Sequence, residues 1–280
     1  MNDQKDPELM KKRIREILDQ VDSEAVRQNE YETIFEVVSV LGSTDSELRD
    51  ELGYTTLAEL LINKKFLNER ELKELLIEVT SDNMLFYKIG EVDTDSVFLR
   101  SFSSLLLALL LYRENQENFL SKSDFDEVVE KVVKYCSKEK DYRGFVDGKG
   151  WAHAIAHIAD VIDECVTNQH ADLGTYKKLW RALSDLLLNA PVVFDSEEDE
   201  RIATPVIAMI ESEKVSLSFA RTWLSEIDIQ TVNMHTRINI KNFTRSFLIR
   251  LLISDIDVDS EEVISMIEEF EHKINADFLL

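Results

Sequence analysis

Residues 95–113 read DSVFLRSFSSLLLALLLYR, and residues 123–139 read SDFDEVVEKVVKYCSKE. In both stretches apolar residues recur at spacings of three and four, which is the period of an α-helix with a buried face. A short polar segment joins the two stretches, so they are expected to pack as an antiparallel helix pair. The same spacing recurs along the whole chain, which contains only three prolines and seven glycines. The sequence therefore predicts an all-α protein.

The predicted helices follow a repeating pattern. They are expected at about residues 7–20, 23–41, 45–64, 68–80, 95–113, 123–139, 150–168, 175–189, 196–213, 216–229, 234–254 and 259–275. From residue 95 onward, helix pairs recur at intervals of roughly forty residues, which is the period of HEAT and armadillo repeats. We therefore predict a HEAT/armadillo-like α-solenoid of stacked antiparallel helix pairs.

The chain is predicted to have two parts. Residues 1–90 are more charged and are expected to form an acidic N-terminal helical cap, whereas residues 91–280 form the helical-repeat domain. The segment 88–94 contains Gly90 and polar residues, which is typical of a break between helices. We interpret this segment as a sub-boundary and not as a linker.

Charge and hydropathy exclude several classes of partner. The 32 basic and 55 acidic residues give a formal net charge of −23, which repels a phosphate backbone, so no nucleic-acid partner is expected. The apolar run Leu105–Tyr112 is far shorter than the ~20 residues of a membrane-spanning helix, so no membrane partner is expected. Cys136 and Cys165 lie at helical spacing among apolar residues, which predicts two buried thiols. These features predict a soluble, cytoplasmic protein.

One stretch differs from the rest of the chain. Residues 143–160 read RGFVDGKGWAHAIAHIAD and hold three of the seven glycines and two of the five histidines. A P-loop is excluded, because only three residues separate Gly144 from Gly148 and because Lys149 is followed by another glycine. Two interpretations remain open. Backbone amides at a helix start, with Arg143 and Lys149 nearby, suit a carboxylate or phosphate, or the glycines simply allow two helices to pack closely.

His153, His157 and Asp160 follow this loop at i, i+4 and i+7, so they are expected on one face of a helix. The position after the first histidine holds Ala154, not the glutamate of a His-Glu-x-x-His metalloprotease. The three side chains still suit a site for a divalent metal such as zinc, manganese or iron. The alternatives are a buried hydrogen-bond network, in which Asp160 orients His157, and contact with a partner.

Arg100 is the other polar residue that breaks its local pattern, because it lies in a largely apolar helix. A buried guanidinium needs an acidic partner, such as Asp93, Asp95 or Asp160. An internal ion pair is therefore expected.

Three segments together resemble a known family. They are residues 93–103 (DTDSVFLRSFS), residues 143–160, and residues 198–203 (EDERIA). The motif Gly-Lys-Gly-Trp-Ala-His-x-x-x-His lies within them. In its residue order and spacing the chain resembles a bacterial family of uncharacterised proteins, domain of unknown function twenty-seven eighty-five. The resemblance extends over about residues 40–255 and implies an all-helical, cytoplasmic protein without an assigned activity. Residues 1–40 depart from it.

The sequence predicts a polar pocket centred on the Gly-Lys-Gly-Trp-Ala-His-x-x-x-His motif. The leading hypothesis is a helical-repeat protein that binds a partner protein or a small anionic ligand there. The alternative is a metal-dependent, hydrolase-like enzyme with His153, His157 and Asp160 as metal ligands. The predicted pocket residues are Arg100, Arg143, Lys149, Trp151, His153, His157, Asp160, Glu200 and Arg201.

Overall fold

The computed structural model describes residues 6–229 and 231–275. The helices are α1 (Pro7–Asp19), α2 (Glu24–Arg27), α3 (Glu30–Val38), η1 (Glu47–Tyr54), α4 (Thr55–Ala58), η2 (Glu59–Asn63), α5 (Glu69–Val79), α6 (Ser96–Glu117), α7 (Lys122–Lys138), α8 (Ala154–Thr167), α9 (Leu173–Leu188), α10 (Glu198–Glu211), α11 (Leu217–Glu226), α12 (Met234–Ile253) and α13 (Ser260–Ile274). The π-helical segments η1 and η2 continue α4 on either side. The described strands are β1 (Phe145–Val146) and β2 (Gly150–Trp151), which pair as a hairpin. The predicted all-α class is confirmed.

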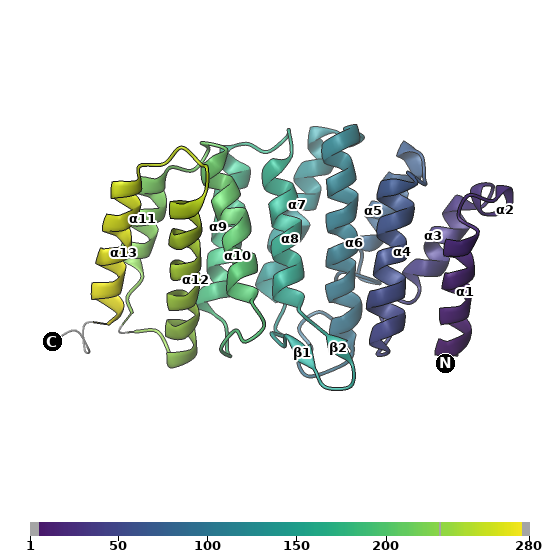
Figure 1. Ribbon diagram of the computed structural model, residues 1–280, viewed down its shortest axis with the longest axis horizontal. Coiled ribbons are helices and arrows are strands. Elements are labelled where there is room, and N and C mark those ends of the chain that lie inside the picture. The colour runs from purple at the N-terminus through teal and green to yellow at the C-terminus, as the bar shows by residue number, and fades with distance from the viewer. Residues whose placement is uncertain (1–5, 230, 276–280) are drawn as a thin grey trace.

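The helices lie side by side along the long axis of the molecule and broadly follow the order of the chain, except that α12 lies between the α9–α10 pair and α11 (Figure 1). In one row, α6 packs against α8, α8 against α10, and α10 against α12. In a second row, α7 packs against α9, and both helices also contact α8. Most contacts therefore join elements that are close together in the sequence.

One hydrophobic core runs through both predicted parts of the chain, from Ile17 to Ile274. Its members lie on both sides of the segment 88–94, so the predicted sub-boundary does not divide the core. Cys136 and Cys165 are buried in it with free thiols, as predicted, and burial raises the pKa of both.

The central helix of this core is α6. By length and composition it is the candidate membrane span among the described residues, but 83% of its apolar window is buried inside the molecule. Packing against α5 on one side and α8 on the other accounts for a helix that is apolar on nearly all faces.

The predicted helix ends differ from the observed ones where the backbone leaves the right-handed region. The helix expected at 95–113 continues to Glu117 and ends at Asn118, whose φ of 54° is left-handed. The helix expected at 150–168 begins only at Ala154, because the preceding residues form the β1–β2 hairpin and His153 has a φ of 51°. His153 is therefore the N-cap of α8 and not part of its first turn.

Candidate functional site

The hairpin of residues 145–151 is built on glycine. Phe145 pairs with Trp151 in an antiparallel register, and the amide of Lys149 donates to the carbonyl of Val146 at 3.0 Å to close the turn. Gly148 and Gly150 both have positive φ angles, of 74° and 78°, that side chains rarely tolerate. The glycines singled out in the sequence therefore form a tight hairpin and not a phosphate-binding loop.

Arg49 in η1 bonds to the backbone of this hairpin. Its guanidinium is fully buried and donates to the carbonyls of Lys149 at 2.8 Å and Trp151 at 3.2 Å. It also lies 4.2 Å from the ring centroid of Phe98 and 4.8 Å from that of Phe102. Burial lowers the pKa of Arg49 to about 10. The sequence pattern did not single out Arg49, because an arginine is ordinary in a charged amphipathic helix.

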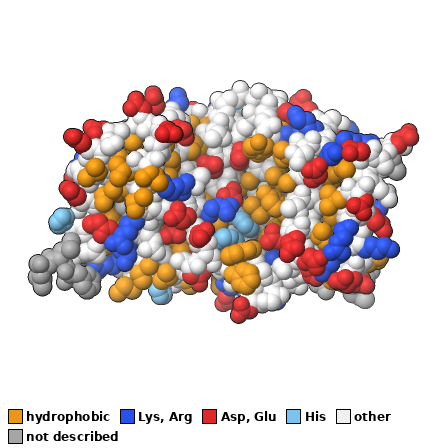
Figure 2. All heavy atoms as spheres, viewed as in Figure 1, with side chains coloured by type: hydrophobic (Ala, Val, Ile, Leu, Met, Phe, Trp, Pro, Cys, Tyr) orange, Lys and Arg blue, Asp and Glu red, His pale blue; other side chains and the backbone are white. Residues whose placement is uncertain are grey.

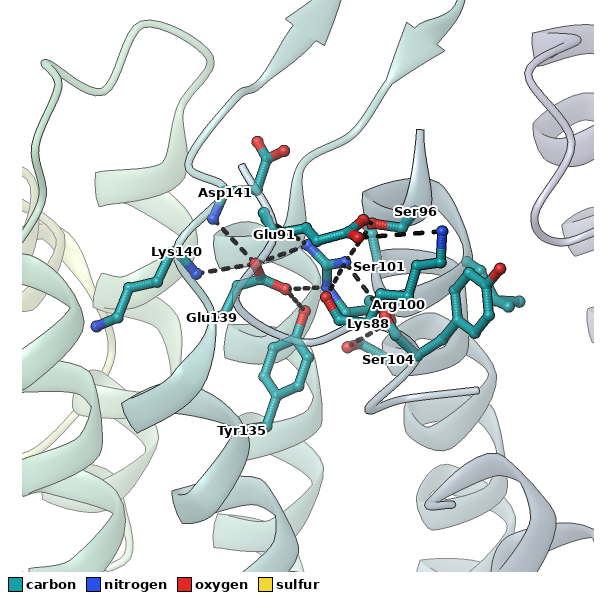
Figure 3. A network of polar contacts seen from close by, with 12 residues as sticks. Lys88, Glu91, Ser96, Arg100, Ser101, Ser104, Tyr135, Glu139, Lys140 and Asp141 are labelled. Carbon is teal, nitrogen blue, oxygen red and sulfur yellow. Dashed lines mark hydrogen bonds and ion pairs between the residues drawn. The ribbon is translucent and has the colours of Figure 1, made fainter. Parts of the chain in front are cut away.

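Arg100 forms a fully buried ion pair with Glu139, at the end of α7 (Figure 3). Its Nε and Nη2 donate to the two carboxylate oxygens at 2.7 and 2.9 Å, and its Nη1 donates to the hydroxyl of Ser96 at 2.8 Å. The carboxylate also accepts bonds from the Tyr135 hydroxyl and from the amides of Lys140 and Asp141, each at 2.9 Å. An internal ion pair was expected, but the partners suggested for it, Asp93, Asp95 and Asp160, were wrong.

Two further cations fasten the hairpin to the start of α6. Arg143 donates to the buried carboxylate of Asp141 at 2.8 and 2.6 Å and to the carbonyl of Thr94 at 2.8 Å. Lys149 pairs with Asp95 at 2.6 Å. Both cations of the predicted loop are therefore engaged by carboxylates of the protein itself.

The two histidines are buried but have separate partners. His153 donates from Nε2 to the carbonyl of Ser196 at 2.7 Å and stacks on Trp151, with ring centroids 4.8 Å apart. His157 lies with Nδ1 2.6 Å from the hydroxyl of Ser101. Burial lowers the pKa of His153 and lowers that of His157 well below its usual value, which favours neutral rings.

Asp160 contacts neither histidine through a hydrogen bond among the described residues. Its carboxylate accepts hydrogen bonds from Arg201 of α10, from Nε at 2.9 Å and from Nη2. The interpretation in which Asp160 orients His157 is therefore wrong, and Ser101 has that position. A serine within the apolar α6 carries no sequence signal for a histidine partner.

The predicted metal site has no geometric support in residues 6–229 and 231–275. No group of three His, Cys, Asp or Glu side chains there is placed to hold a metal ion. The rings of His153 and His157 do lie near each other, with centroids 5.5 Å apart, but each of the three side chains is bonded to another group: His153 to Ser196, His157 to Ser101 and Asp160 to Arg201. A buried carboxylate, that of Glu198, lies near His153, with Oε1 3.5 Å from Nε2.

The predicted pocket thus divides into neighbouring clusters. Arg100 faces Glu139, whereas the next residue, Ser101, faces His157, so the two clusters lie on different faces of α6. Glu200 is farther along α10, where it accepts a bond from Ser246 and pairs with Arg250. The three sequence segments do meet in space, but their polar groups do not line one cavity.

A wide groove lies beside these clusters. It has a volume of about 780 Å³ and is formed by α1, the segment before η1 and the segment that leads into α6. Asp95 and Ser96 line it, but none of the predicted pocket residues does.

Two half-buried carboxylates, Asp163 and Glu164, follow Asp160 along α8. Burial raises the pKa of Asp163 to about 6 and that of Glu164 to about 7, and the neighbouring carboxylates add to the effect. The side chain of Asn115 donates to Glu164 at 2.9 Å, which offsets only part of it.

Glu164→Gln is expected to stabilise the protein at pH 8 more than at pH 5. Because the folded-state pKa of Glu164 is about 7, above its usual 4.5, the stability of the unmodified protein falls as pH rises from 4.5 through about 7. The neutral amide removes this loss, which we place at about 1 kcal/mol after solvent screening. Urea denaturation at both pH values measures it. Exposed Glu32→Gln is the control, and an equal gain at pH 5 and pH 8 contradicts the prediction.

The comparison with known proteins identifies a family. Residues 85–253 match the family described as "Protein of unknown function (DUF2785)". The match covers all three segments that carry the resemblance, but it begins at residue 85 and not near residue 40 as expected. No curated protein and no solved structure matches the chain. Because the match spans more than half of the 280 residues, the chain belongs to the DUF2785 family.

Proposed function

We propose that this protein is a cytoplasmic, HEAT-like α-solenoid that binds a partner protein through the hairpin between α7 and α8. The carrying observation is the aromatic ledge, by which we mean the side chains of Phe145 and Trp151. They are 55% and 38% exposed, and their rings meet edge to face with centroids 5.0 Å apart. Figure 2 shows a histidine side chain beside hydrophobic side chains near the middle of the face that is turned toward the viewer. Exposed aromatic rings on a rigid support are typical of binding surfaces.

The buried charges next to the ledge support this function. Replacing a buried ion pair by apolar residues is often neutral or stabilising, so such a pair is poor evidence of selection for stability alone. Here Arg49 bonds to the hairpin itself, and the Arg100–Glu139 pair orders the backbone at residues 140–141 that leads into it. These charges act together to hold one conformation of a short hairpin, which is what a preorganised binding surface needs.

A small anionic ligand fits the same surface less well. Arg143, Lys149 and Arg201 already pair with Asp141, Asp95 and Asp160. An anion has to compete with those carboxylates for each cation. A protein partner that uses the exposed rings needs no such exchange.

The test is affinity capture from a lysate of the producing organism, with bound proteins quantified by mass spectrometry. The double variant Phe145→Ala/Trp151→Ala is expected to lose at least about tenfold of one partner that the unmodified protein retains. The control is Leu173→Ala/Ile77→Ala, which removes two exposed apolar side chains elsewhere, 55% and 66% exposed. Thermal melts confirm that all three proteins are folded.

Equal retention of every captured protein by both double variants contradicts the proposal. Metal analysis of the same untagged protein tests the enzyme alternative. Substoichiometric metal, with a melting temperature indifferent to added zinc or manganese, is the expected result. Stoichiometric metal that disappears in His157→Ala favours the metal-dependent enzyme instead.

A further inference from the structure

We propose that the occupant of the aromatic ledge is a basic protein segment, which places an arginine or lysine side chain against the exposed rings of Phe145 and Trp151. This inference rests on the proposed function and specifies the chemistry of its partner.

Three exposed carboxylates belong to the hairpin and to the segment that packs against it. Asp147 lies in the turn of the hairpin itself, and Asp195 and Glu197 lie in the segment before α10. All three are exposed, and none of them forms an ion pair with a residue in the described part of the chain. Asp195 accepts a single hydrogen bond, from the hydroxyl of its neighbour Ser196.

The segment before α10 packs directly against the hairpin. A Cβ built on Gly144 lies only 2.2 Å from the hydroxyl of Ser196, and the Ser196 carbonyl accepts the bond from His153. His153 in turn stacks on Trp151. Burial lowers the pKa of His153, the bond to Ser196 raises it, and the charge of Arg201 lowers it. Glu197 and Asp195 have smaller, raising effects, as expected for carboxylates in the neighbourhood of the ring.

The surplus charge at the ledge is therefore negative. The nearby cations Arg143, Lys149 and Arg201 are each paired with a carboxylate, so they leave no positive charge to balance the flanking groups. Acidic residues in the first turn of a helix are common because they interact favourably with its dipole, which accounts for Asp199 within α10. That explanation does not extend to Asp147, which lies on the hairpin, or to Asp195, which precedes the helix.

Aromatic rings beside unpaired carboxylates suit a cation. A guanidinium or ammonium over an aromatic face is attracted by the ring electrons, and arginine also stacks its planar group on the ring. The carboxylates then meet the remaining charge and steer a basic partner toward the ledge. A second copy of this chain, with a net charge of −23, is repelled by the same groups.

The experiment selects a phage-displayed random peptide library on the purified full-length protein. Peptides that bind the unmodified protein but not Phe145→Ala/Trp151→Ala are sequenced, and one is synthesised. Enrichment of arginine and lysine is expected. The affinity of the synthetic peptide is expected to fall at least about tenfold with the triple variant Asp147→Asn/Asp195→Asn/Glu197→Gln and to weaken with added salt.

The matched control is Asp19→Asn/Asp82→Asn/Glu226→Gln, which removes three exposed carboxylates elsewhere and is expected to bind as the unmodified protein does. Ledge-dependent peptides that are neutral or acidic overturn this inference but leave the proposed function standing. The absence of any ledge-dependent peptide overturns both. Ledge-dependent dimerisation in sedimentation velocity identifies a second copy as the occupant and also overturns the inference.

Discussion

Arg100→Met is expected to lower the free energy of unfolding by about 3 to 5 kcal/mol, because it leaves the carboxylate of Glu139 buried without its counter-charge. Both side chains of this pair are fully inaccessible, and Glu139 has no second cation within ion-pair distance among the described residues. Its remaining bonds, from Tyr135 and two backbone amides, cannot supply the lost charge. Urea denaturation followed by far-ultraviolet circular dichroism measures the loss.

Two further variants separate charge from packing. Arg100→Met/Glu139→Gln keeps an oxygen acceptor for the amides but removes the charge, so it is expected to recover a large part of the lost stability. Lys178→Met breaks an exposed pair with Glu130, whose side chains are 53% and 59% accessible, and is expected to cost under about 1 kcal/mol. A single variant Arg100→Met that is no less stable than Lys178→Met contradicts the prediction.

Gly144→Ala is expected to cost about 2 to 3 kcal/mol, the upper part of the usual range for overpacking. The added Cβ would lie 2.2 Å from the Ser196 hydroxyl, 2.5 Å from its Cβ and 2.8 Å from the buried Oε1 of Glu198. Relief of that overlap has to move the start of α10 away from the hairpin and lengthen the bond from His153 to Ser196. Faster hydrogen exchange at the amides of Ala152 and His153, with the lowered stability, is the expected signature.

Gly148→Ala is the matched control for this substitution. Gly148 has a φ of 74° with nothing within 4 Å of the added Cβ, so it tests backbone strain alone. Its expected cost is about 1 kcal/mol, without loss of protection at His153. A loss of stability in Gly144→Ala no larger than in this control contradicts the prediction. The hairpin and the segment before α10, which carries Asp195 and Glu197, are then not in close contact.

Local pattern was enough to find most helices. The ends of α5, α7, α9 and α12 lie within about two residues of the ranges predicted from periodicity. Apolar spacing and capping residues are local signals, because each depends only on residues a few positions apart. Other helices differ more: α6 continues to Glu117, and the single helix predicted at 23–41 is two helices, α2 and α3. The start of α8 also differs. Its predicted start was set by the helix-forming residues after Gly150, but pairing of the two short strands takes the backbone out of the helix until Ala154.

The sequence by itself determined the helical class, the family and the segments in which polar residues break an apolar pattern. Each of these depends only on which residues occur and how they are spaced along the chain. Only the tertiary structure decided the partners. Arg100 pairs with Glu139, His157 contacts Ser101 and Asp160 pairs with Arg201. These partners are 39, 56 and 41 residues apart in the sequence. The physical reason is that a buried polar group must be satisfied by whichever group the packing of helices brings within about 3 Å, and that proximity has no local signature.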